Sequence, residues 1–590
     1  MTTFQRQRLY RELRKDLRPL PERAKKALQK LWGERLHFLS IAITVAGFIA
    51  LAVTITVMFS AIIPYDMDEF IHYHPLFCHY YPFNILNSFR GSCHAYDLDF
   101  LSTGIILPLR SFDYTGSFTA ILYAPLFLMW RSPLSARLLG MFFLGFQSWI
   151  LGKLFHRKVL PIFLGLLLFF PYFFQHLVDT GPVSYQITTV YLLYLLFQKW
   201  HSRLKARYAV TAAVVFFCGM WVKPTELWLL PGIGALFCFS LWEHWGMCAA
   251  PSHRKTFVLQ CLLFGLTALL LSGILLLSTN PSNPADQPLL RQIVMGEHLS
   301  VAEVGKQFFS LPTVRSLLNP LEATHRIYEV SRLVQSVQWT YNALLFAPLL
   351  LAIMGLALRR RAWRDALKSI LMYAAFAGTL FVVFRTEKAW AMHHTVLAFP
   401  FLILSTLFAL DILRTARAEW KTFLLRAAAS VAAIGFVAVN LTAFAAFPFQ
   451  KVRVFNDRSK IAVNTLLHSD ILAKRYFYVI ADWGMYYYQG LYGSDDQGVL
   501  YMRELRQQAQ LDSLRELAAK YNRKLLFVLD SHAPSSDLAL LTSNLDLRRC
   551  TALPEKAVWQ VVLEHDTAPQ NPCFEVPAGT LEKMRKMLGL

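Results

Sequence analysis

Residues 38–63 read FLSIAITVAGFIALAVTITVMFSAII, a run that contains no charged residue. At about 1.5 Å per helical residue, this run is long enough to cross about 30 Å of hydrocarbon. Residues 256–278 form a second such run. The core helices of water-soluble proteins rarely extend this far without a charge. The two runs therefore predict an α-helical polytopic membrane protein.

The distribution of charged residues along the chain also indicates a membrane protein. Hydrophobic residues make up 55% of the 590 residues and charged residues 16%, while the formal net charge is +21. The basic residues do not mark one face, as nucleic-acid binding would require, and we expect no nucleic-acid partner. They gather instead in short blocks between apolar runs, the distribution of cytoplasmic loops near anionic lipid. These blocks are 5–35, 153–158, 199–207, 254–255, 359–368 and 414–426.

One topology places every basic block in the cytoplasm. It has about eleven spans, starting near 37–63 and including a helix near 227–245. The basic N-terminal segment is too long for a cleavable signal peptide. We expect a cytoplasmic segment (1–36), a membrane module (37–449) and an exported tail (450–590), in a multi-pass protein of a bacterial inner membrane. The other expected spans lie near 135–152, 159–177, 183–198, 208–223, 256–279, 339–358, 366–384, 394–413 and 422–447.

Three segments are predicted to be exported: the loops 64–115 and 280–338, and the tail. Residues 116–130 are apolar but short and contain Pro125, so we expect a juxtamembrane or re-entrant helix rather than a span. In the tail, strand-like runs flank a helical pattern over 502–521, which predicts a small exported α/β domain.

The cysteines agree with this orientation. Four of the eight fall in or beside predicted helices, whereas Cys78 with Cys93, and Cys550 with Cys573, are pairs in exported segments. Pairs confined to one side of the membrane indicate disulfides in an oxidising compartment.

The first exported loop begins IPYDMDEFIHYHPLFCHYYP and carries Asp66, Asp68 and Glu69 just after the first span. Carboxylates at this interface are costly unless they are solvated, paired or functional. A solvated acidic loop is one interpretation, and a divalent metal site shared with the histidines is another, less favoured one. The third is a base that takes a proton from an acceptor hydroxyl or amine.

An Asp-Glu pair after the first helix, followed by aromatics and His-Pro (DEFIHYHPL, 68–76), resembles the GT-C superfamily. These membrane glycosyltransferases use polyprenyl-phosphate sugars and include protein O-mannosyltransferases and aminoarabinose transferases. The resemblance implies a GT-C-like membrane module with Asp68 as the base, while Glu69 or Asp66 orients a substrate. The full signature of no subfamily is present, so the sugar and the acceptor stay open.

A lipid-phosphate donor needs positive charge at the outer ends of the helices. The segment RTEKAWAMHHTVLAFP (385–400) supplies it against the positive-inside trend, and Lys223 before Pro224 is a further cation. Such cations bind a departing phosphate, although snorkelling side chains give the same pattern. The candidate phosphate-binding residues are Arg385, Lys388, His393, His394 and Lys223.

Further substrate contacts are predicted around the acidic loop. His72 and His74 lie in it, and Asp99 follows downstream, with Asp97 and Asp113 as weaker candidates. Asp179, in VDTGP, resembles the single Asp that aminoarabinose-transferase-like proteins carry at this position; a structural cap is the alternative.

These features predict an inverting glycosyltransferase that acts on the exported side. The expected partners are a polyprenyl-phosphate-linked sugar, membrane lipid and an acceptor of unknown class, with no certain cofactor. Two other functions stay open: a ligase or polymerase of lipid-linked glycans, and a transporter of lipid or solute. A transporter would place ionisable residues at mid-bilayer, whereas the ionisable residues here cluster at helix ends.

Overall fold

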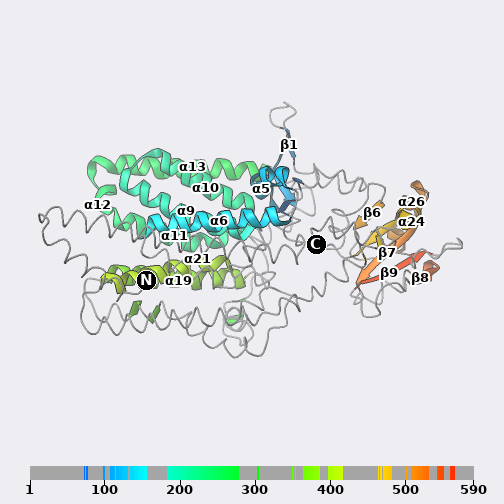
Figure 1. The fold of residues 1–590 in the computed structure, drawn as a ribbon. Helices are drawn as coiled ribbons and strands as arrows, with labels where there is room; N and C mark the ends of the chain where they lie inside the picture. The colour runs from blue at the N-terminus through cyan, green and yellow to red at the C-terminus, as the bar shows by residue number, and fades with distance from the viewer. Residues whose placement is uncertain are drawn as a thin grey trace, which may run out of the picture.

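The computed structural model defines a helical bundle and a separate sheet (Figure 1). The structure describes residues 72–73, 75–76, 97–99, 106–112, 115–130, 133–155, 182–277, 300, 302–303, 349–350, 352–353, 363–385, 396–415, 463, 466–467, 470–481, 498–501, 507–530, 541, 543–549 and 559–564.

The described bundle consists of apolar helices that follow the predicted runs closely. Three of its helical stretches are long and apolar enough to cross a membrane: Pro224–Glu243, Pro251–Gly273 and Trp363–Val383. The helices are α5 (Phe118–Met129), α6 (Pro133–Leu154), α9 (Pro182–Arg203), α10 (Ala206–Val222), α11 (Leu230–Glu243), α12 (Trp245–Cys248), α13 (Pro251–Leu277), α19 (Trp363–Arg385) and α21 (Phe399–Thr415).

Several predicted spans cannot be compared with the structure. The runs 37–63, 159–177 and 422–447 lie outside the described residues, and 339–358 does so for the most part. The total of about eleven spans therefore stays a prediction.

The span predicted over 227–245 begins differently from a simple α-helix. A 3₁₀ helix, η2 (Pro224–Leu229), precedes α11. Pro231 lacks the N–H that would bond to the carbonyl of Leu227, so an α-helix cannot run unbroken through this segment. The tighter 3₁₀ turn places Lys223 and Glu226 close to the preceding helix, α10.

The core of the bundle forms around α9. Val190, Leu193 and Trp200 are fully buried in it. Contacts fix the helix directions: Phe143 of α6 packs on Tyr185 with ring centroids 4.3 Å apart, and Phe155 packs on Phe408 of α21 at 5.1 Å. The Phe408 ring lies 6.4 Å from that of Tyr194. Thus α6 and α9 run in the same direction, as the predicted topology requires.

The two ends of the bundle differ in charge. The Trp200 indole donates to Gln260 at 2.7 Å, and Lys368 pairs with Glu243, so α13 and α19 start where α9 and α11 end. We call this the basic end, and the opposite end the Lys223 end. The basic end collects Lys153, Lys199, Arg203, Lys205, Arg207, Arg254, Lys255, Arg364 and Lys368.

Short first-loop elements lie at the Lys223 end. β1 (Asp97–Asp99) pairs with β2 (Ile106–Pro108), and β3 (Arg110–Phe112) pairs with β4 (Thr115–Gly116), both antiparallel. The 12 residues of α5 span about 18 Å, too short for about 30 Å of hydrocarbon. This length agrees with the predicted juxtamembrane helix.

Five described strands of the tail form a mixed sheet, in the order β6-β5-β7-β9-β8. β5 is parallel to β6 and β7, whereas β9 is antiparallel to β7 and β8. Helix α26 (Gln508–Lys520) buries Leu511, Leu514 and Ala518 against one face. The strands are β5 (Tyr476–Ile480), β6 (Gly498–Tyr501), β7 (Lys524–Asp530), β8 (Leu547–Arg549) and β9 (Trp559–Glu564), preceded by α24 (Asp470–Arg475). The export of this region stays a prediction.

Candidate functional site at the Lys223 end

Trp221 joins the first loop to the end of α10. Its indole donates to the carbonyl of Leu109 at 2.7 Å, and its ring lies 5.3 Å from that of Phe118. Gly116 packs directly on the Trp221 backbone, where a Cβ would overlap the carbonyl oxygen. These contacts hold the β3–β4 hairpin and α5 against the helix that ends next to Lys223.

The loop segment that follows the acidic cluster packs against α5. The Thr119 hydroxyl donates to the carbonyl of His72 at 3.3 Å, and the rings of Tyr73 and Tyr123 lie 4.3 Å apart. Tyr123 in turn is 2.5 Å from the Ser135 hydroxyl of α6. His72 follows Asp68 by four residues in the sequence, and the acidic cluster itself lies outside the described residues.

The backbone of Lys223 is bonded on both sides. Its N–H donates to the carbonyl of Gly219 at 3.2 Å, and its carbonyl accepts from the N–H of Glu226 at 3.1 Å. Gln186 of α9 donates to the same carbonyl at 3.1 Å and to the Thr225 hydroxyl at 3.0 Å. The Lys223 conformation is extended (φ −160°, ψ 133°), as expected before proline. The backbone of Lys223 is therefore closely held.

Glu226 is fully buried beside Lys223. Its Oε1 lies 2.8 Å from the Thr189 hydroxyl of α9, and its other oxygen has no hydrogen-bond partner within the described part of the chain. Gly219 provides the room for this carboxyl, since a Cβ there would lie 2.7 Å from Glu226 Cδ. No Lys, Arg or His among the described residues pairs with it.

The donors and acceptors around Glu226 favour its protonated form. The Thr189 oxygen lies 2.7 Å from the carbonyl of Gln186 and 2.8 Å from Glu226. A hydroxyl has one hydrogen, and an ionised carboxylate and a carbonyl both only accept. If the carboxyl carries a proton, it donates to Thr189 while Thr189 donates to Gln186. Isolated buried charge is costly, so the neutral acid fits this environment.

The structure places only part of the predicted site. His72 is buried, with 3% of its surface exposed; Lys223 is half-buried. Arg385 is the last residue of α19, which runs from the basic end toward the Lys223 end, and Asp99 ends β1. The remaining predicted residues lie outside the described part of the chain, and their roles stay predictions: Asp66, Asp68, Glu69, His74, Asp113, Asp179, Lys388, His393 and His394.

The residues of the predicted metal site and of the predicted disulfides also lie largely or wholly outside the described part of the chain. Within the described residues, no three His, Cys, Asp or Glu side chains come together as metal ligands would. The acidic cluster of the metal hypothesis is not among them. Cys218, Cys238, Cys248 and Cys261 are free thiols. The predicted pairs Cys78–Cys93 and Cys550–Cys573 are also outside the described ranges.

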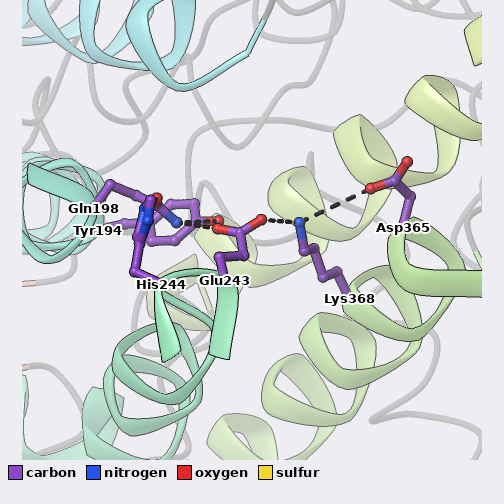
Figure 2. A network of polar contacts seen from close by, with 6 residues as sticks. All are labelled: Tyr194, Gln198, Glu243, His244, Asp365 and Lys368. Atoms are coloured by element: carbon purple, nitrogen blue, oxygen red, sulfur yellow. Dashed lines mark hydrogen bonds and ion pairs between the residues drawn. The ribbon is translucent and has the colours of Figure 1, made fainter. Parts of the chain in front are cut away.

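A second polar cluster occupies the basic end (Figure 2). Glu243 accepts from Lys368 and from Gln198. The amide oxygen of Gln198 lies 3.0 Å from His244 Nε2. The Lys368 ammonium group lies 3.9 Å from the Asp365 carboxylate. This cluster joins α9, α11 and α19 through charges of opposite sign, and none of its members is a predicted site residue.

Glu226, Gln186 and Thr189 were not predicted from the sequence. A signal existed for Gln186, because an amide inside a membrane helix seeks a partner on another helix. Glu226, in WVKPTELWLLPG, looked like a loop residue between two spans. Only the fold brings it against Thr189, 37 positions away.

The chain matches no family model and no curated protein. Among solved structures it resembles ArnT from Cupriavidus metallidurans bound to undecaprenyl phosphate. The TM-score is 0.51 at 13% identity, over 89% of this chain and 99% of that one. Weaker matches are the apo state of the same ArnT (TM-score 0.40, 10% identity, 89% and 99% covered) and the apo Archaeoglobus fulgidus oligosaccharyltransferase (0.39, 10%, 82% and 69%). Scores below 0.5 are too low to argue from. The first likeness shows a GT-C-like fold, as the sequence predicted.

Proposed function

We propose that this protein is a membrane glycosyltransferase that moves a sugar from a polyprenyl-phosphate carrier to an acceptor at its Lys223 end. A shared fold alone does not specify a reaction. The observation that carries the proposal is the arrangement of the Lys223 end, where the backbone of Lys223 is held next to the first-loop residues that pack on Trp221. Arg137 of α6 and Arg385 of α19 also lie toward this end of the described helices, while most of the other basic residues gather at the far end.

In the proposed reaction, Asp68 accepts the proton of an acceptor hydroxyl or amine. The freed electron pair attacks the anomeric carbon, and the bond from that carbon to the phosphate oxygen breaks. Its electrons leave on the polyprenyl phosphate, so one displacement inverts the sugar. Glu69 or Asp66 orients a substrate, with contacts from His72, His74, Asp99 and Asp179. The departing phosphate gains negative charge, which Arg385, Lys388, His393, His394 and Lys223 stabilise.

The exported side is the proposed location of this reaction. Polyprenyl-phosphate donors carry sugars across the membrane, where nucleotide sugars are absent. The positive-inside rule supports a cytoplasmic basic end and therefore an exported Lys223 end. The ArnT structure contains undecaprenyl phosphate, and a carrier lipid of this kind is the donor class that we propose here.

Release of the carrier tests the function. Purified full-length protein in nanodiscs is incubated with a panel of undecaprenyl-phosphate-linked sugars and with a membrane fraction as the source of acceptor. Mass spectrometry follows free undecaprenyl phosphate and the glycosylated product. We expect both to appear together for one donor. Binding of a carrier-linked sugar without release of the carrier from any donor would contradict transfer and indicate translocation.

A further inference from the structure

Two arginines converge on one tyrosine at the turn from α9 to α10. The guanidinium groups of Arg203 and Arg207 donate to the hydroxyl oxygen of Tyr208, with N–O distances of 3.3 Å and 3.2 Å. The guanidinium carbon of Arg207 also lies 5.0 Å from the centroid of the Tyr208 ring. Both arginines are exposed. A single phenol oxygen therefore holds two positive charges close together at the basic end.

No carboxylate compensates these two charges within the described part of the chain. The continuous stretch 182–277 contains only two carboxylates, Glu226 and Glu243. Glu226 lies at the opposite end of the bundle, and Glu243 accepts from Lys368 and Gln198 instead. The ion pairs given by the described residues include neither arginine. Because like charges repel, an anion bound between the two guanidinium groups would stabilise this arrangement.

The turn that carries the arginines is built around a strained residue. Leu204 has φ 48°, in the left-handed region that residues with a Cβ rarely adopt. Its N–H donates to the carbonyl of Trp200 at 2.7 Å, and its carbonyl accepts from the amide of Gln260 at 2.6 Å. The Trp200 indole donates to Gln260 at 2.7 Å, and both side chains are buried. Contacts within α9 and from α13 therefore hold the backbone between Arg203 and Arg207 before any ligand binds.

The face of α10 that begins at Arg207 indicates which anion the pair meets. Arg207, Thr211 and Val214 follow one another at helical spacing, and all three are exposed. The Thr211 hydroxyl donates to the Arg207 carbonyl at 2.7 Å, so beyond the arginine this face is apolar. In a bundle that crosses a membrane, such a face lies against lipid, and its charged start lies near the headgroups. A phospholipid can place its phosphate at the arginines and an acyl chain along α10, whereas a soluble anion gains only the first contact.

From this geometry we infer that Arg203 and Arg207 form a binding site for the phosphate of an anionic phospholipid at the basic end. Guanidinium groups donate pairs of charge-assisted hydrogen bonds to phosphate oxygens, and basic pockets beside membrane helices suit anionic headgroups. Tyr208 is a positioning residue, because its hydroxyl orients both guanidinium groups in advance and so reduces the ordering cost of binding. The site lies at the opposite end from the proposed sugar transfer and does not depend on it.

The test measures phospholipid binding to the full-length protein in detergent by native mass spectrometry, with phosphatidylglycerol and phosphatidylcholine as the probes. Ammonium acetate at about 0.2 M screens attraction between distant charges. The first site should prefer phosphatidylglycerol. Arg203→Gln/Arg207→Gln should weaken this first binding step by about tenfold or more, since charge-assisted hydrogen bonds are lost. Tyr208→Phe keeps both charges and should weaken it by about threefold, with no further loss when it is added to the arginine double variant.

A matched control removes two other charges from the same end. Arg254 and Lys255, near the start of α13, are exposed like the arginine pair. Arg254→Gln/Lys255→Gln should change the first binding step by less than about threefold. Equal losses from the two double variants would show that net charge alone attracts the lipid and would overturn the inference. Wild-type affinity in Arg203→Gln/Arg207→Gln, with folding confirmed by gel filtration, would overturn it as well.

A last arm separates the two sources of phosphate. Inorganic phosphate, added without lipid, should not bind with a comparable dependence on Arg203 and Arg207, because it lacks the acyl chains that contact α10. If its binding depends on the two arginines as strongly as that of phosphatidylglycerol, the site belongs to a soluble anion and the lipid assignment fails. Wild-type affinity for phosphatidylglycerol in Tyr208→Phe would reject the positioning role of Tyr208.

Discussion

Glu226 and Glu243 lie near opposite ends of one apolar stretch, Pro224–Glu243, and their surroundings differ in charge. Glu243 is 30% exposed and pairs with Lys368. Glu226 is fully buried, and its described partner is a neutral hydroxyl. The basic end is held by opposite charges, whereas at the Lys223 end Gln186 and Thr189 of α9 bond to the Lys223 carbonyl and to Glu226. We interpret the first as a structural clamp and the second as a place prepared for an anion.

The largest effect is expected from the first-loop base. Asp68→Asn should lower the transfer rate by about 100- to 10,000-fold, because general-base catalysis contributes that much. Glu243→Gln, a carboxylate removed at the basic end, should change the rate per folded molecule little. Initial rates at saturating donor measure both. Full activity in Asp66→Asn, Asp68→Asn and Glu69→Gln alike would place the base elsewhere.

The next effect concerns stability at the basic end. Lys368→Met should destabilise the protein by about 1–3 kcal/mol, since Glu243 and Asp365 lose a charged partner, with the loss moderated by partial solvent exposure. Thermal unfolding in detergent measures the change. Adding Glu243→Gln should recover part of it. A double variant less stable than Lys368→Met would argue against the ion pair.

The positions of the membrane helices could be predicted from the sequence, whereas the site residues stay predictions. The apolar runs bounded by basic blocks predicted the positions of α6, α9, α10, α11, α13, α19 and α21, because length and hydropathy are local properties. The acidic cluster and the basic turn around Lys388 were also proposed from local patterns and stay predictions. Lys223 alone among the predicted phosphate ligands has described surroundings on both sides.

The sequence could not predict how the polar residues pair. Gln186 bonds to a carbonyl 37 positions away, and Lys368 pairs with Glu243 at a separation of 125. The periodicity of a sequence does not indicate pairs so far apart in the chain, because such pairs depend on which helices pack together. The surroundings that favour a protonated Glu226, its burial and its contact with Thr189, likewise depend on the fold.

A smaller effect should distinguish the chemistry of Glu226. Glu226→Gln keeps a group that can donate to Thr189, and its cost should be below about 1 kcal/mol. Glu226→Ala leaves a cavity and an unsatisfied hydroxyl, and should cost about 2–4 kcal/mol. Chemical denaturation in mixed micelles gives both values. A Gln variant as unstable as the Ala variant would indicate that Glu226 is ionised in the native protein.

The smallest effect is expected from metal removal. The proposed mechanism uses carboxylate and cationic side chains, so EDTA should leave the transfer rate unchanged. The assay is repeated after dialysis against chelator and after return of Mg²⁺, Mn²⁺ or Zn²⁺. A loss of activity that one of these ions restores would favour the metal site considered for Asp66, Asp68 and the histidines.

The comparison between the two ends is tested most directly by one matched pair of variants, Lys223→Met and Lys368→Met. The measurement is kcat/KM for sugar transfer per folded molecule, with folded protein quantified by gel filtration. We predict a decrease of about tenfold or more for Lys223→Met and little change for Lys368→Met. Equal values for the two variants, or a larger decrease for Lys368→Met, would contradict a phosphate-binding role for the Lys223 end.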